Sequence, residues 1–445
     1  MFFAALTCPR GNPVATATMR SVAATRPHAH RRRIHGFGYF RSLGPGIVTG
    51  ASDDDPSGIG TYSQVGAAFR FGFLWTALLT WPLAAAVQET AARLGLANGR
   101  GLASLIKERY PRWVLVAAVT LVTSANVFNI GADLGSMASA IHLLLPVPFV
   151  GLIVAITGGM LALEVKVPYR SYSKVLRWLT LSLVAYVAML FVVDVNWGGV
   201  LRHSVFPTMT WDRVHVAALI AILGTTISPY LFFWQTSEEV EEMENSGAEG
   251  TSTPLDIGHL KHMRQDVLTG MASAVIVMFS IMVAAGATLG KAGVTTIQTA
   301  DQAAQALKPI AGQFASLLFT LGIVGTGLLA VPVLAGSTAY AIAEAIDQPE
   351  GLSKPFRGAR GFYLIIGAAM VLGLASNFAG LNPVRALYFS AILNGLAAPP
   401  LVLVMLLLSR SEATCGRWTG GTLSTILMAV TFLLMAGLPF VYLFT

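Results

Sequence analysis

Charged residues and cysteines are both scarce in this sequence, and each shortage excludes a class of protein. Only 11% of the 445 residues are Asp, Glu, Lys or Arg, whereas 54% are hydrophobic, and the mean hydropathy is +0.65. Soluble domains carry about 25% charged residues, so the bilayer must be the solvent of this chain. Two cysteines, Cys8 and Cys415, are too few for a disulfide framework or a cysteine metal cluster.

Eleven apolar runs are long enough to cross a hydrocarbon core of about 30 Å, which takes about 20 helical residues. These runs fall at 44–67, 71–95, 113–141, 147–165, 176–196, 213–236, 266–290, 314–344, 361–378, 384–408 and 420–443. The sequence therefore predicts an all-α membrane protein with eleven transmembrane helices.

The distribution of lysine and arginine predicts how the chain is oriented. If the N-terminus is cytoplasmic, 22 of the 29 basic residues fall in cytoplasmic segments and six on the other side, with Arg93 inside a span. This asymmetry predicts a cytoplasmic N-terminus, an external C-terminus and a location in the bacterial plasma (inner) membrane. The net charge of +7 lies in short connections and not on one amphipathic face, so no nucleic-acid partner is expected.

Two polar segments lie outside the predicted spans. Residues 1–42 are rich in arginine and lack Asp and Glu; they read as a basic cytoplasmic tail or as an over-extended start with Met19 as initiator, and a transit peptide is the alternative. Residues 237–265 are acidic and rich in Ser and Gly, which predicts a solvated cytoplasmic loop. His259 and His262 in that loop have no further ligand beside them, so a metal site there is not favoured.

The first apolar run is interrupted in its middle by Asp53, Asp54, Asp55 and Pro56. Each Asp at the bilayer centre is destabilising by about 2.5–3.5 kcal/mol, so a bound cation or a water-filled cavity must compensate. Asp55 followed by Pro56 has the pattern of an N-cap residue with proline at the first helical position, which is how a helix restarts. The pattern predicts a helix that stops and begins again in mid-membrane.

The sixth run has a second break, where Gly224 loosens the backbone and Ser228-Pro229 restarts the helix. Four intact spans separate the two breaks, so spans one to five and six to ten form two similar halves. A repeat of five spans reverses its orientation in the second copy, which predicts an inverted repeat whose broken helices meet at mid-membrane. The predicted segments are 1–42, 43–197, 198–409 and 410–445, and the last holds an appended eleventh helix.

This architecture resembles the leucine-transporter fold, and the motifs resemble those of the NRAMP family of divalent metal transporters. The resemblance covers about residues 40–440 and is closest to the divergent, magnesium-type branch. The motifs that carry it are GPG at 44–46, Asp55-Pro56-Ser57-Gly58, Gln88-Glu89, the stretch 92–95 and Ala132-Asp133-Leu134.

The resemblance implies a metal site at the two breaks. Asp55 is the first expected ligand, because a carboxylate beside free helix-end carbonyls suits a cation. Gly58 replaces the family's Asn ligand and Ser228 replaces its methionine sulfur, which makes the site harder and roomier and favours Mg²⁺ or Mn²⁺. The full set of expected metal-site residues is Asp55, Ser228, Ser52, Thr225, Asp54, Asp53, Gly58 and Asn394.

Proton coupling is expected to be weak or absent, because Asn126, Tyr230 and Gln235 stand where the family often has Glu or His. Amides do not titrate near neutral pH, and tyrosine does so only after a large pKa shift. Asp133 is interpreted either as an ion-path residue or as a structural partner of Arg93 or of a polar neighbour. Trp234 is expected to pack in the protein core, and a place in the wall of a cavity is the less favoured interpretation.

The sequence thus predicts a transporter of divalent cations, Mg²⁺ or Mn²⁺ above Fe²⁺, that works by alternating access. It predicts no enzyme and no resident cofactor, and the expected partners are the transported cation and the lipid bilayer. The alternatives are a symporter of organic solutes on the same fold, with Na⁺ at Asp55, and a metal channel or sensor.

Overall fold

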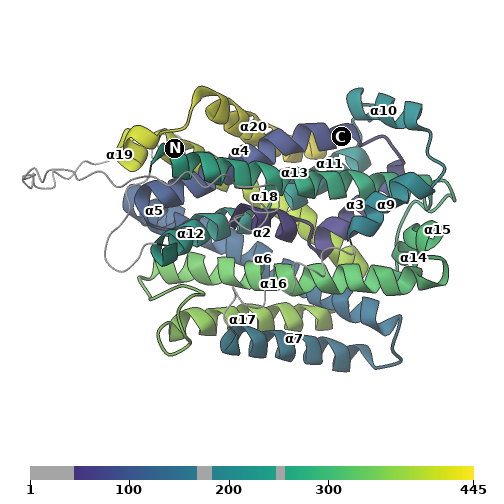
Figure 1. Cartoon of the computed structure of the whole chain (residues 1–445), viewed down its shortest axis with the longest axis horizontal. Helices are drawn as coiled ribbons and strands as arrows, with labels where there is room; N and C mark the ends of the chain where they lie inside the picture. Colours follow the sequence, from purple (N-terminus) through teal and green to yellow (C-terminus); the bar gives the residue numbers. More distant parts are fainter. Residues whose placement is uncertain (1–44, 168–182, 247–255) are drawn as a thin grey trace, which may run out of the picture.

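The computed structural model describes residues 45–167, 183–246 and 256–445, and these form an elongated helical bundle (Figure 1). The helices that correspond to the predicted spans of the first half are α2 (Pro45–Asp53), α3 (Pro56–Phe69), α4 (Trp75–Asn98), α6 (Arg112–His142), α7 (Phe149–Lys166) and α9 (Val184–Val192). Those of the second half are α11 (Arg213–Thr226), α12 (Pro229–Ser246), α13 (Ile257–Ala287), α16 (Ala315–Ala345), α17 (Arg360–Ser376) and α18 (Pro383–Arg410), and α20 (Thr422–Phe444) is the last helix.

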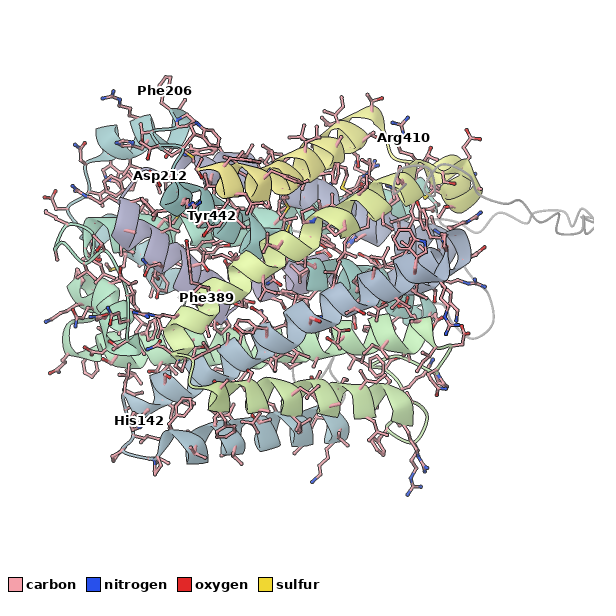
Figure 2. All side chains as sticks on the ribbon, turned by 180° about the vertical axis from the view of Figure 1, so that it is seen from behind. His142, Phe206, Asp212, Phe389, Arg410 and Tyr442 are labelled. Atoms are coloured by element: carbon pink, nitrogen blue, oxygen red, sulfur yellow. The ribbon has the colours of Figure 1, made fainter. Side chains whose placement is uncertain are left out.

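Short helices connect these elements at the ends of the bundle. They are α5 (Leu102–Arg109), α10 (Trp197–Val205), α14 (Ala300–Ala304), α15 (Lys308–Ala311) and α19 (Glu412–Cys415). Figure 2 shows Arg410 at one end of the bundle and Phe206 and Asp212 toward the other. Connections that carry charged residues thus lie at the two ends, where a membrane protein meets water.

The predicted spans agree with these helices to within a few residues, except at the fifth, which is described only in part, and at the sixth and seventh, where α12 extends to Ser246 and α13 begins at Ile257. Eight of them are apolar helices, or a broken pair, of at least 18 residues that could cross a membrane. The other three correspond to the pair α2 and α3, to α4 with its polar residues Gln88, Glu89 and Arg93, and to α9. Most of the predicted fifth span, 176–196, lies outside the described residues or beyond the end of α9.

The prediction of a loop over 237–265 is wrong for most of its length. Helix α12 continues to Ser246 and α13 already begins at Ile257, where the Asp256 side chain accepts a hydrogen bond from His259 N. The acidic residues after Ser237 follow the apolar part of α12 without a helix breaker, so the helix extends past the apolar span. Residues 247–255 lie outside the described part of the chain.

The two broken helices lie inside a scaffold of continuous helices. Helices α2 and α3 both pack on α13, α11 packs on α18, and α6 packs on α16, α17 and α18. Figure 1 shows α2 and α3 near the centre of the bundle, with α16 beside them and α17 and α7 on one outer face.

Glycine allows the broken helices to approach their neighbours closely. A Cβ atom at Gly50 in α2 would lie 2.3 Å from the carbonyl oxygen of Gly270 in α13. One at Gly224 in α11 would lie 2.1 Å from the carbonyl oxygen of Ala391 and 2.3 Å from the amide nitrogen of Gly395 in α18. No side chain fits at these distances, so glycine at 50 and 224 is what lets the broken helices sit on the scaffold.

Candidate functional site

The first helix break is where the sequence places it. Helix α2 ends at Asp53 and α3 begins at Pro56, with Asp55 as N-cap residue in an extended conformation. The Asp55 carboxylate accepts hydrogen bonds at Oδ1 from Ser57 Oγ at 2.6 Å and from Gly58 N at 2.7 Å. At Oδ2 it accepts one from Asn129 Nδ2 of α6 at 2.9 Å. These donors hold a buried carboxylate in one orientation while lone pairs remain for a cation.

The second break faces the first. Helix α11 ends at Thr226 and α12 begins at Pro229. The Ser228 hydroxyl donates to the carbonyl oxygens of Gly224 at 3.0 Å and Thr225 at 2.7 Å, which are carbonyls at the end of α11. Thr225 Oγ1 lies 3.2 Å from Ser57 Oγ, so one hydrogen bond joins the two breaks next to Asp55.

Tyr230 also joins the two breaks. Its phenol donates to the carbonyl oxygen of Ser52, in the last turn of α2, at 2.8 Å. The backbone carbonyl of Tyr230 in turn accepts from Ser337 Oγ of α16 at 2.7 Å. The Tyr230 hydroxyl therefore uses one carbonyl at the end of α2 as its hydrogen-bond acceptor. This bond links the end of α2 to α12.

The other expected site residues are buried around the breaks, and several of their polar atoms have no hydrogen-bond partner among the described residues. These atoms are Ser52 Oγ, both carboxylate oxygens of Asp53, Oδ1 of Asp54 and both amide atoms of Asn394. Asn394 lies on α18 beside Gly395, which packs on Gly224 near the second break. Buried polar atoms normally have hydrogen-bond partners. A hydrated cation could supply the missing partners for these atoms.

The three consecutive carboxylates do not form one cluster. Within the described ranges no group of three His, Cys, Asp or Glu side chains converges as a metal site. The backbone changes from helical at Asp53 to extended at Asp55, so no regular helical spacing brings the three carboxylates to one point. The candidate site is therefore one carboxylate, Asp55, with neutral oxygens around it. Gly58 takes part through its amide, which holds Asp55 in place.

Asp133 is a fourth carboxylate in this region, and it does not pair with Arg93. It is fully buried on α6, one turn beyond Asn129, and neither carboxylate oxygen has a hydrogen-bond partner in the described structure. Arg93 bonds to Glu89 at 3.2 Å and to the carbonyl oxygen of Trp418 at 3.0 Å. The interpretation of Asp133 as a partner of Arg93 is thus wrong, because Glu89 stands one turn back on the same helix.

Buried negative charge is the main electrostatic feature of this region. Asp53, Asp54, Asp55 and Asp133 are between 0% and 3% exposed. The ion pairs of the described residues include none of the four. Because an uncompensated charge in a low-dielectric interior is strongly unfavourable, this arrangement favours either protonation or a bound cation.

The residues that replace titratable groups of the NRAMP family have neutral roles in the structure. Asn126 Nδ2 donates to the Leu334 carbonyl oxygen at 3.2 Å and to Thr338 Oγ1 at 3.0 Å, both on α16. Gln235 accepts from Thr49 Oγ1 of α2 and donates to Glu239 Oε1 at 2.8 Å. Asn126 thus joins two scaffold helices, α6 and α16, and Gln235 joins the two broken helices through α2 and α12.

Trp234 has the packing role that the sequence favours. Trp234 is fully buried and packs edge-on against Tyr340, with ring centroids 6.2 Å apart. His259 lies on the exposed start of α13, 3.0 Å from Asp256.

Asn129 and Ser57 are functional candidates that sequence reasoning did not single out as ligand-positioning residues. Asn129 recurs with Asn126 and Asp133 on one face of α6, and that polar face was the available signal. Ser57 follows the Asp55-Pro56 restart, where hydroxyl residues often bond to the capping side chain.

A polar vestibule lies at the end of the bundle where α12 ends. It is a cavity of about 480 Å³ lined by Lys107, Glu108, Glu241, Glu244, Asp347, Glu350 and neighbouring residues. Glu241 on α12 closes one side: it accepts hydrogen bonds from the Tyr340 hydroxyl, from Leu352 N at 2.8 Å and from Ser353 N at 3.0 Å. Toward the opposite end, a cavity of only about 20 Å³, with Ile59 and Leu387 in its mostly apolar lining, lies beside α3.

Two discontinuous helices that meet at buried polar side chains, inside a scaffold of continuous helices, define the leucine-transporter-like class of membrane transporters. Solved structures agree with this fold. A point mutant of the manganese transporter of Eremococcus coleocola superposes with a TM-score of 0.68 at 18% identity and covers 91% of this chain and 87% of its own. Mhp1, a nucleobase-cation-symport-1 family transporter, superposes with a TM-score of 0.60 at 15% identity, over 91% of both chains.

The chain belongs to the natural resistance-associated macrophage protein-like (Nramp) family, whose model matches residues 46–445. The divalent metal cation transporter MntH of Caldanaerobacter subterraneus is 23% identical over 382 residues, which is 84% of this chain and 86% of the relative. The protein of the same name from Acidiphilium cryptum is 26% identical over 389 residues, 84% of this chain and 83% of the relative. The resemblance in the sequence motifs is thereby confirmed at the level of the family.

Proposed function

We propose that this protein carries divalent metal cations across the membrane by alternating access, and that it is not an enzyme. The observation that carries the proposal is the set of four buried carboxylates around two helix breaks, none in an ion pair within the described structure. Its relatives are divalent metal cation transporters by name, and one solved neighbour is a manganese transporter. Membership of the same family supports the same class of cargo here.

Mg²⁺ or Mn²⁺ is the favoured substrate, and Fe²⁺ is a weaker one. Ser57 and Asn129 bond to Asp55, and Thr225 and Ser228 supply hydroxyls at the second break; no sulfur or imidazole takes part in these contacts. Hard oxygen ligands suit Mg²⁺ and Mn²⁺. Mg²⁺ keeps several of its waters, so a site with one carboxylate and many neutral oxygens fits a partly hydrated ion.

Movement of α2 and α12 against the scaffold would give access to the vestibule. Both half-helices lead from the breaks toward one end of the bundle, and α12 ends beside the vestibule that Glu241 lines. On the orientation that the basic residues favour, this is the cytoplasmic end and α3 and α11 lead outward. The protein then releases its cation into the cytoplasm from the bacterial plasma membrane.

Weak or absent proton coupling completes the proposal. Asn126 and Gln235 form hydrogen bonds through their amides, and the Tyr230 hydroxyl donates a hydrogen bond to the Ser52 carbonyl oxygen. None of these groups relays a proton near neutral pH without a large change in its environment. Asp133 and the three consecutive aspartates are the acids that could still couple protons to the metal.

Reconstituted protein tests the function directly. Purified protein in liposomes should take up Mg²⁺ or Mn²⁺ with saturation, at a rate that falls when the two ions compete. Saturable uptake of an organic solute that needs Na⁺, with no metal flux, would instead identify the symporter alternative. Flux that rises linearly with concentration would identify a channel.

A further inference from the structure

A groove on the outer surface of the bundle lies between α4, α13 and α20, away from the helix breaks. Its volume is about 510 Å³, and its lining includes Trp81, Ala86, Glu89, Arg264 and Ser424. The groove lies along the first turns of α13 and α20 and the middle of α4. Figure 1 shows these three helices together on the face opposite α7 and α17.

One end of the groove carries an unneutralised positive charge. Glu89 accepts hydrogen bonds from Arg93, from Arg264 Nε at 2.9 Å and from Ser424 Oγ at 3.2 Å. One carboxylate thus faces two guanidinium groups, which leaves one net positive charge. Arg264 uses only Nε in this contact, and its side chain is 46% exposed, so its terminal nitrogens can still donate.

The first turn of α20 adds backbone donors beside this charge. The N-cap residue Gly421 supplies no side-chain hydrogen bond, and Gly421, Thr422 and Leu423 all line the groove. The helix dipole and its free amides favour an anion at the same place as Arg264.

The rest of the groove is apolar and faces the surface that the bilayer covers. Trp81, Leu268 and Leu423 line it and are 43%, 47% and 70% exposed. The Trp81 indole lies over α13, with Nε1 3.5 Å from the Leu268 carbonyl oxygen. Pro82, Ala85 and Ala86 form the wall on α4, and their small side chains leave the space open.

We propose that this groove binds one anionic phospholipid, with its phosphate at Arg264 and the first turn of α20 and one acyl chain along Trp81, Ala86 and Leu268. A phospholipid matches both parts of the groove, because its headgroup carries one negative charge and its chain is apolar. Basic pockets between membrane helices suit anionic headgroups. On the orientation proposed above, the lipid belongs to the cytoplasmic leaflet. The site touches neither helix break, so its occupancy stands apart from the metal site.

Native mass spectrometry of the full-length protein, with phosphatidylglycerol and phosphatidylcholine as probes, tests the site. Wild-type protein should retain one phosphatidylglycerol in preference to phosphatidylcholine. Arg264→Gln should weaken that retention about tenfold, the loss expected for one charge-assisted contact. Arg360→Gln is the matched control: it changes an exposed arginine at the start of α17, on the other face, and should retain the lipid.

Ala86→Phe tests the acyl-chain part without altering charge. The added ring would fill the groove, so phosphatidylglycerol retention should fall while inorganic phosphate has no effect on either protein. Thermal unfolding of each variant in detergent checks that it is folded. Equal retention of the two lipids by wild type, full retention by Arg264→Gln, or displacement of the lipid by inorganic phosphate would each overturn the proposal.

Discussion

Asn129 Nδ2 donates a hydrogen bond to Asp55 Oδ2 at 2.9 Å and thereby links the continuous helix α6 to the break between α2 and α3. The donor belongs to the scaffold, while the carboxylate belongs to the helix that restarts. Because an amide cannot become charged, the bond orients Asp55 without neutralising it. The negative charge is thus left to be balanced by a proton or a cation, and a scaffold residue helps to set the position of the carboxylate.

Asp55 should therefore act through its charge and not only as a helix cap. Asp55→Ala removes both roles, whereas Asp55→Asn keeps a capping oxygen and removes the charge. Both variants should lose saturable metal uptake by about tenfold to a hundredfold, the range for a contact to a charged group. Uptake in liposomes and thermal unfolding are measured together, and Asp194→Ala, which changes an exposed aspartate, is the control. Normal uptake by Asp55→Asn would assign position 55 to capping alone.

Ser228 should set the preference of the site for hard ions. Ser228→Met places a thioether at the second break and frees the carbonyls of Gly224 and Thr225, to which the hydroxyl now donates. Soft ligands favour Cd²⁺ and Fe²⁺ over Mg²⁺, so inhibition of Mg²⁺ uptake by Cd²⁺ should strengthen about tenfold. Ser228→Ala frees the same carbonyls without adding sulfur and should not strengthen it. Unchanged Cd²⁺ competition in a folded Ser228→Met protein would place residue 228 outside the site.

Metal flux should leave the pH inside liposomes unchanged when the membrane potential is clamped. Asn126 and Gln235 are bonded as amides, and Tyr230 donates to the Ser52 carbonyl, so the proton relays of related transporters have neutral substitutes. A pH dye inside the liposomes reports the outcome during Mg²⁺ or Mn²⁺ uptake. Acidification that scales with metal uptake and disappears in Asp55→Ala would show coupling through the aspartates.

The contact between α2 and α13 should tolerate no side chain. A Cβ at Gly50 would meet the Gly270 carbonyl oxygen at 2.3 Å, so Gly50→Ala should lower the free energy of unfolding by about 1–3 kcal/mol and slow transport. Gly158→Ala is the matched control, because nothing lies within 4 Å of a Cβ at that position of α7. Thermal unfolding and uptake are compared for the two variants. Equal behaviour would mean that α2 does not pack closely on α13.

Glu350, in the connection after α16, should make stability depend on pH. Burial, together with the negative charges of Glu344, Glu241 and Glu244 and against the positive charge of Lys354, raises its pKa from 4.5 to about 9. The folded protein then holds this proton more tightly than the unfolded chain does. The contribution of Glu350 to stability is fully present below about pH 4.5 and is lost as pH rises toward 9.

Glu350→Gln should flatten that dependence. Between pH 5 and pH 8 the wild-type protein should lose up to about 4 kcal/mol more stability than the variant, at about 1.4 kcal/mol for each pH unit. Urea or thermal unfolding at several pH values measures the difference. Glu412→Gln changes an exposed carboxylate at the same end and should keep the wild-type slope. A wild-type slope in Glu350→Gln would show that another group carries the dependence.

Local sequence signals were enough to predict the helices and their breaks. Asp55-Pro56 and Ser228-Pro229 mark the restarts because capping and proline geometry act within a few residues. The end of α12 was missed because acidic residues continue a helix as readily as they form a loop.

Contacts between helices that are distant in the chain could not be predicted from the sequence. The bonds from Asn129 to Asp55 and from Tyr230 to Ser52 join residues 74 and 178 positions apart, and tertiary packing alone decides them. The Glu89–Arg93 pair, at i and i+4, was readable from spacing, and it settles the partner of Arg93. Which of the buried oxygens contact the cation stays a prediction.

The hydrogen bonds of Glu241 determine how the vestibule can open. Its single carboxylate accepts three hydrogen bonds from α16 and from the connection after it, through Tyr340, Leu352 and Ser353. If α12 moves away, all three bonds must break together, because they share one acceptor group. Opening of this end is then a two-state event and not a gradual widening. The rate of opening should then depend steeply on temperature. The bonds of one side chain, Glu241, set this dependence, even though a whole half-helix moves.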